Sequence, residues 1–120
     1  MGLAKKWIGV SPQTAQSMQG DANTAITAAG TAITTATDLT NVVNIITSGA
    51  DGTGVQLDTG VVGDSQLVYN ATATSKKVYP SSATAGINQI AVGSAHILAP
   101  YTSCMYYVAS ATQHIGFLSA

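Results

Sequence analysis

The second half of the chain places the tightest limit on what this protein can fold into. From Gly63 to Ala120 the sequence is a series of short apolar runs, each closed by Gly, Pro, Asn, Asp or Ser. Short apolar or alternating runs separated by turn residues are typical of an all-β sandwich or barrel. The same stretch contains no recognisable catalytic motif, so it informs about fold before it informs about function.

The predicted fold is a small β-sandwich or jelly-roll-like barrel of about eight short antiparallel strands, preceded by an extended N-terminal arm. We assign residues 1–23 to the arm and residues 24–120 to the β domain. Two short strands are expected around a turn at Gly30. The remaining strands are expected at 41–47, 55–58, 65–70, 76–79, 94–99, 103–109 and 113–118. Asp51-Gly52 lies between two of them and favours a tight hairpin turn.

The arm combines a basic, apolar start with a polar continuation. Lys5, Lys6, Trp7 and Ile8 form a compact cluster, and the Gln-containing stretch after Val10 has little apolar content. Such a segment cannot build a core of its own. Trp7 either covers one end of the β domain or anchors the chain on a partner, where Trp is favoured. We expect Lys5, Lys6, Trp7 and Ile8 to contact the partner surface or a neighbouring subunit.

The charge content is low for a soluble domain. Charged residues make up 8% of the chain, against roughly 25% in ordinary domains, and there is no Arg and no Glu. The net charge of −1 gives no electrostatic basis for binding nucleic acid. Much of the apolar content is Ala, which buries little area, so the core is expected to be thin. We therefore expect a homo-oligomer, with a trimer favoured and a dimer as runner-up.

Cysteine usage and hydropathy exclude several other classes. Cys104 is the single cysteine, so no intrachain disulfide can form. No run of about 18 apolar residues is present, and we expect no membrane partner. The start of the chain lacks the pattern of a signal peptide or of a myristoylation site.

Histidine and cysteine are the first candidates for chemistry. His96 and His114 are the two histidines, and a nucleophilic triad would join one of them to Cys104 or a serine. No nucleophile-elbow motif supports this arrangement, and an ordinary half-buried His96 and a small core Cys104 are favoured. One cysteine and two histidines also lack the close paired spacing of a zinc site.

Aspartates and lysines in the turns are the second group of candidates. Asp51, Asp58 and Asp64 bracket two loops and could offer carboxylates to calcium, but turn capping is the favoured interpretation because the EF-hand spacing is absent. The glycine-rich loop at 49–54 lacks the ending of a phosphate-binding loop. Lys76 and Lys77 are expected at the top of a solvent-facing turn. We expect no catalytic, cofactor-binding or metal-binding residue, and the chain is not expected to be an enzyme.

Several short motifs, taken in order, resemble a β module of structural proteins in tailed-bacteriophage virions. The resemblance covers residues 31–118, and it departs at Gln113-His114-Ile115, where such modules often have Gln-Trp-Tyr. The matching motifs are Gly63-Asp64, Val68-Tyr69-Asn70, Val78-Tyr79-Pro80, Ile87-Asn88, Ala95-His96-Ile97-Leu98 and Tyr106-Tyr107.

The resemblance implies a capsid decoration, or cement, protein. Such a protein would be made in the host cytoplasm, bind the major capsid protein on the outer capsid surface, and clamp neighbouring capsomers. Repeated symmetric sites reward oligomers and multivalent contact. The alternative is a head-fibre or carbohydrate-binding β module of the virion, although scarce Trp counts against a sugar platform.

Overall fold

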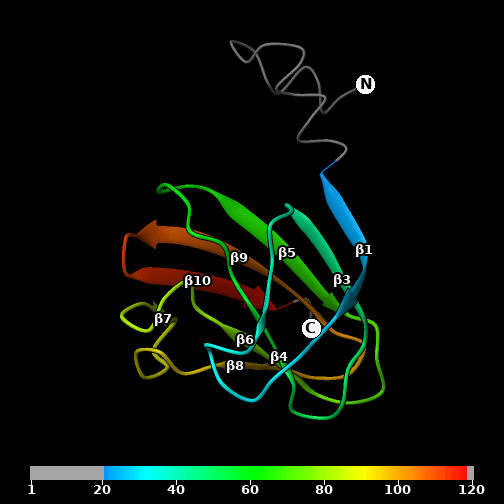
Figure 1. Ribbon diagram of the computed structural model, residues 1–120. Helices are drawn as coiled ribbons and strands as arrows, with labels where there is room; N and C mark the ends of the chain where they lie inside the picture. The colour runs from blue at the N-terminus through cyan, green and yellow to red at the C-terminus, as the bar shows by residue number, and fades with distance from the viewer. Residues whose placement is uncertain (1–20, 119–120) are drawn as a thin grey trace, which may run out of the picture.

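A computed structural model describes residues 21–118 of the 120-residue chain. Figure 1 shows two layers of strands wound around a common interior. The ten strands in the described part of the chain are β1 (Ala22–Thr27), β2 (Thr37–Asp38), β3 (Val43–Ser48), β4 (Gly54–Gln56), β5 (Ser65–Asn70), β6 (Lys76–Tyr79), β7 (Gly86–Ile87), β8 (His96–Leu98), β9 (Ser103–Ser110) and β10 (Gln113–Leu118). Across residues 21–118 no helix is long and apolar enough to cross a membrane.

The strands form a six-stranded sheet, in the order β1-β3-β5-β9-β10-β7, and a four-stranded sheet, in the order β2-β4-β6-β8. From β1 to β6 the chain alternates between the two sheets, so each strand lies beside the strand two places earlier. The ladders β1–β3, β3–β5, β2–β4 and β4–β6 are all parallel. This winding makes the protein a short parallel β-solenoid of about four turns.

The expected antiparallel sandwich or jelly roll is therefore wrong, although the all-β class is confirmed. The strands at 65–70 and 76–79 begin and end where the sequence predicted them. Their direction was misjudged because alternation reports which face of a strand is buried and carries no information on its partner. The Asp51-Gly52 turn illustrates the error: it leads from β3 in one sheet to β4 in the other, instead of closing a hairpin.

Glycine permits one of these corners. Gly49 has a φ of +121°, and a side chain there would place its Cβ 2.6 Å from the carbonyl oxygen of Ala28. An L-residue rarely adopts this backbone conformation, and a contact this short with backbone requires a shift of the chain. Gly49 thus allows the β3–β4 connection to pass close to the preceding turn of the solenoid.

Among the ladders between strands, the antiparallel ones all involve β8, β9 or β10, and a single isolated antiparallel bridge joins Ala29 to Gly54. β8 pairs with β6, β9 pairs with β5 and with β10, and β7 adds a short parallel ladder on the far side of β10. Of these strands, β9 and β10 are joined by a tight turn and form a hairpin. The last part of the chain therefore ends the parallel stacking by reversing direction in both sheets.

The core lies between the two sheets and consists of the side chains that point inward. Ile46, Val68 and Tyr106 supply it from the six-stranded sheet, and Val78 and Leu98 from the four-stranded sheet. Each fully buried aliphatic or aromatic side chain contributes about 1.5–3 kcal/mol. The other buried apolar residues of this cluster are Ile26, Ala28, Leu39, Val55, Leu57, Ile87 and Cys104.

Asn70 ties the two sheets together by hydrogen bonds. This wholly buried side chain on β5 donates from Nδ2 to the carbonyl oxygens of Thr74, at 2.8 Å, and of Leu98, at 3.1 Å. Its Oδ1 accepts from the amide and the hydroxyl of Thr72, at 3.0 and 2.6 Å. One side chain thereby shapes the turn after β5 and satisfies a carbonyl of the opposite sheet.

Replacing Asn70 by Ala is expected to destabilise the protein by about 1–3 kcal/mol, because buried carbonyl groups lose their donor. The matched control is Asn23→Ala on β1, where an exposed Asn accepts only a local bond from the amide of Ala25. That change should stay within about 0.5 kcal/mol. Urea unfolding of both variants measures the difference, and equal losses would contradict the role given to Asn70.

Candidate functional site

The first candidate site is a pair of rings that joins the two sheets. His96 on β8 and Tyr106 on β9 form a hydrogen bond of 2.7 Å between Nδ1 and the phenolic oxygen. Their ring centroids are 5.7 Å apart, at an interplanar angle of 75°. Burial lowers the pKa of His96 and raises the pKa of Tyr106, so the imidazole and the phenol are both kept neutral. The pair serves as a cross-link between the layers.

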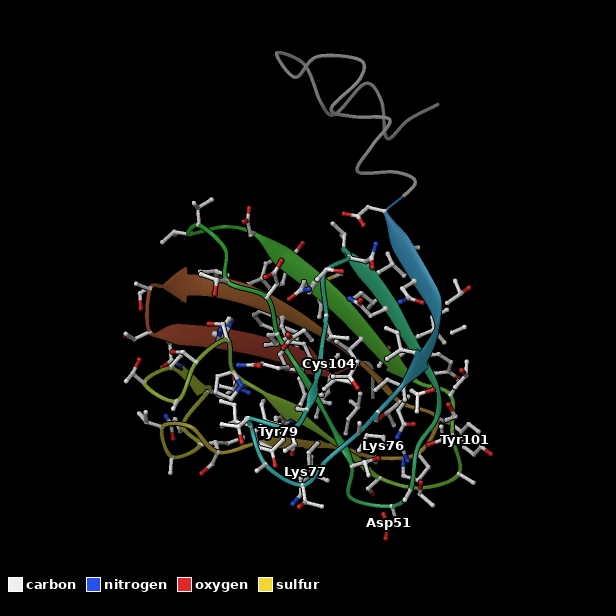
Figure 2. The ribbon with its side chains drawn as sticks, viewed as in Figure 1. Asp51, Lys76, Lys77, Tyr79, Tyr101 and Cys104 are labelled. Carbon is white, nitrogen blue, oxygen red and sulfur yellow. The ribbon has the colours of Figure 1, made fainter. Side chains whose placement is uncertain are left out.

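Cys104 lies two residues before Tyr106 on the same inner face of β9, in the space between the sheets (Figure 2). The side chain is 1% exposed, and burial raises the pKa of its thiol. A thiol nucleophile requires the thiolate form and access to substrate, so this thiol is inert. The expectation of a small core cysteine is consistent with this position.

His114 occupies a different place, at the start of β10, and its partner is Ser81. The Ser81 amide donates to His114 Nε2 at 3.3 Å, and the Ser81 hydroxyl lies 3.1 Å from the same nitrogen. Because Nε2 has one lone pair and the amide occupies it, the imidazole is poorly placed to take a proton from the hydroxyl. No hydrogen bond within residues 21–118 joins the other ring nitrogen to a carboxylate. The contact joins β10 to the end of β6, and burial lowers the pKa of His114.

A polar pocket of about 380 Å³ is the second candidate site. Asp51, Asp58 and Asp64 were considered as calcium ligands. The pocket brings Asp58 and Asp64 together, but its third aspartate is Asp21, and Asp51 is not among its lining residues. The other lining residues are Thr40, Asn41, Val42, Thr59, Gly60, Gly63, Ser65, Gln66, Tyr106, Val108 and His114. No group of three His, Cys, Asp or Glu residues within the described chain is arranged to hold a metal ion.

The polar groups of this pocket are already engaged in shaping the turns around it. Asp64 Oδ2 accepts from the amide of Val61 at 3.0 Å, and Asp58 Oδ1 accepts from the amide of Thr59 at 2.9 Å. Gln66 accepts from the amide of Asp58 and donates to carbonyl oxygens on the neighbouring turn. Turn capping, the interpretation that the sequence favoured, therefore describes Asp58 and Asp64.

Lys76 was expected in a solvent-facing turn, and that expectation is wrong. It is the first residue of β6 and is wholly buried, whereas Lys77 is partly exposed. Figure 2 shows Lys76 among the side chains of the interior. Its Nζ contacts the Thr74 hydroxyl and lies 3.5 Å from the Thr74 carbonyl oxygen. The alternation that buries Val78 also buries Lys76, and Thr74 supplies the polar contacts of its ammonium group.

The third candidate is a surface. Eight large apolar residues on β3, β5, β9 and β10 point away from the core, alternating with the buried ones, and we call them the outer face. Ser65, which pairs with Tyr107, shares the same side of the sheet. In register across the sheet, Val43 lies beside Leu67, Leu67 beside Met105, and Met105 beside Phe117. None of the eight is charged. The outer face consists of Val43, Ile45, Leu67, Tyr69, Met105, Tyr107, Ile115 and Phe117.

Aromatic rings make up the most exposed part of the outer face. Phe117 is 60% exposed and Tyr107 is 38% exposed, and their ring centroids lie 5.6 Å apart at 76°. On the inner side of β10, Gly116 leaves room for the core, since a Cβ there would lie 3.0 Å from Cys104 Sγ. A strand pair that is apolar on both faces is typical of a sheet covered on both sides.

The outer face was not predicted, although the amino-acid sequence carries a signal for it. Cys104-Met105-Tyr106-Tyr107-Val108 is apolar without alternation, which indicates burial on both sides of a strand. The run was predicted as one strand, at 103–109, and a second apolar face was not considered. The residues expected to contact a partner, Lys5, Lys6, Trp7 and Ile8, lie outside the described residues, as does most of the predicted arm at 1–23.

Comparison with known proteins adds no assignment, since no protein-family model, curated protein or solved structure matches this chain.

Both histidines should make the protein sensitive to mild acid. Because burial lowers their pKa below the ordinary 6.5, the unfolded chain binds more protons than the folded one in weak acid. The stability linked to His96 and His114 is present above about pH 6.5, and it is lost as the pH falls through the lowered pKa values of the folded state. The urea midpoint is expected to drop between pH 7.5 and 5.5.

The double variant His96→Gln and His114→Gln tests the source of this drop. Glutamine does not titrate, so the urea midpoint of the variant should depend less on pH over the same range. A variant whose midpoint falls as steeply as that of the parent would show that other groups cause the acid sensitivity.

Proposed function

We propose that this chain is a non-enzymatic capsid decoration protein of a bacteriophage, which binds the outer capsid surface and stabilises the contacts between capsomers. The observation that carries the proposal is the outer face, an apolar sheet surface without a charged residue, which favours a protein that works within an assembly over one that stays a free monomer. Contiguous apolar surface of this kind marks a site of protein contact. The virion context comes from the sequence resemblance, which links the chain to phage structural modules.

The physical properties of the chain suit attachment to a large protein shell. Because only 8% of its residues are charged, the surface is weakly hydrated, and covering part of it in an assembly lowers the free energy of the protein. A cement protein meets many identical sites, so modest contacts at each site add up through multivalency. The partner is the major capsid protein, reached after synthesis in the host cytoplasm.

The contact residues proposed for the capsid are Lys5, Lys6, Trp7 and Ile8. Trp7 and Ile8 supply apolar anchors, and the two lysines supply salt-sensitive attraction to acidic groups at the rim of the contact.

A head-fibre or carbohydrate-binding module is the second candidate function. The polar pocket favours it, because carboxylate, amide and hydroxyl groups are the partners that sugar hydroxyls need. Most of these groups hold the turns in place, which leaves fewer of them for a ligand. A glycan array probed with the purified protein tests this candidate, and binding that Gln66→Ala abolishes would support it.

Binding to shells tests the decoration role directly. Purified protein is mixed with capsids of the virus that encodes it, assembled without the protein, and sedimented together with them. The full chain should co-sediment and should raise the temperature at which the shells come apart. Failure on both counts would refute the proposal.

Trp7→Ala should weaken shell binding by about 30-fold, which corresponds to the cost of about 2 kcal/mol for truncating an anchor. Tyr101→Ala is the matched control, because Tyr101 is an aromatic side chain, 62% exposed, on the turn before β9. The control should bind as the parent does. If Trp7→Ala also binds as the parent does, the capsid contact lies elsewhere on the chain.

A further inference from the structure

The outer face is larger than its eight residues, because exposed apolar side chains continue it at the end of β9. The turn at 61–64 is held there by a bond of 2.9 Å from the amide of Gly63 to the carbonyl oxygen of Val108. Val61 and Val62 on this turn are 72% and 69% exposed. The apolar surface thus runs across β3, β5, β9 and β10 and onto an adjoining turn.

We propose that a second copy of this chain docks on the outer face, sheet against sheet. The face consists of side chains that gain by leaving water and offers no charge that would select a partner of opposite sign. The outer face of a second copy is a suitable partner, since the same apolar patch meets itself across a twofold axis. Two sheets packed in this way lie about 10 Å apart and interdigitate their side chains.

The area of the face is adequate for such a contact. Aromatic side chains bury about 150–250 Å² each, so Phe117 and Tyr107, at 60% and 38% exposure, present on the order of 200 Å² together. With Val61, Val62 and the six partly exposed residues, the face presents on the order of 500 Å². Two copies would bury about 1,000 Å², which is the lower limit for a specific interface.

A second copy also solves a problem that a capsid partner cannot. Before a shell is present, a free chain would expose the whole face to water. A copy of the same chain is available from the moment of synthesis, and association through the face covers the exposed apolar surface at once. The sheet keeps its hydrogen bonds and its core unchanged, because the outer residues take no part in the packing between the two layers.

The experiment compares full-length variants by sedimentation equilibrium at micromolar concentration. The parent should sediment as a dimer of the 12.1 kDa chain, because a twofold contact closes with two copies. Phe117→Lys and Tyr107→Lys should each dissociate it to monomer, since either change places a charge on the most exposed part of the outer face. Ile97→Lys is the matched control, because Ile97 is an apolar residue, 55% exposed, on β8 of the other sheet. The control should keep the mass of the parent.

Circular dichroism and the urea midpoint keep the test decisive, because they show whether each variant retains the fold. The proposal is overturned if the parent is monomeric, if folded Phe117→Lys and Tyr107→Lys keep the mass of the parent, or if Ile97→Lys dissociates it equally. It is also overturned if Trp7→Ala dissociates the oligomer, since the occupant would then be the N-terminal segment. Self-association is measured without capsids, so its failure is distinguishable from failure of the decoration role.

Discussion

The packing of the two sheets against each other is the constraint on which the rest of this structure depends. The six-stranded and four-stranded layers meet through side chains that alternate along each strand, so every inward residue is matched by an outward one. Ile46 and Val68 can lie in the core only if Ile45 and Leu67 lie outside it. The apolar outer face follows from this geometry once the strands carry apolar residues at both sets of positions.

In the described chain, polar side chains hold the fold together and apolar side chains form an exposed surface. The polar side chains that suggest chemistry, Asp64, His96 and His114, are bound within the fold and leave little for a substrate. The large exposed side chains of the outer face are apolar, with Phe117 the most exposed among them. This arrangement is the physical basis on which we propose a structural role for the protein.

Most strand positions could be predicted from this sequence, although the strand expected directly after Gly30 is a turn and β2 follows it at Thr37–Asp38. Strand direction could not be predicted. Runs such as Ser65–Asn70 carry alternation and turn residues that locate them to the residue. Whether the next strand returns alongside or crosses to the other layer depends on the path of short turns, and Asp51-Gly52 fits either path. β7 was not predicted because a two-residue strand has no periodicity.

Among the candidate residues, the capping role of Asp58 and Asp64 could be predicted because it is local. The partners of His96 and Lys76 could not, because they are set by the winding of the chain.

The reversal of direction at β8 and β9 determines when the solenoid can form. Parallel neighbours such as β1 and β3 are separated by a whole turn of chain, whereas β9 and β10 are joined by a tight hairpin, whose closure is the fastest of these pairings. β9 then pairs with β5, which supports β3 and, through it, β1. The hairpin of β9 and β10 is therefore expected to be the first of these pairings to close, and the parallel ladders of the earlier turns are expected to assemble on it.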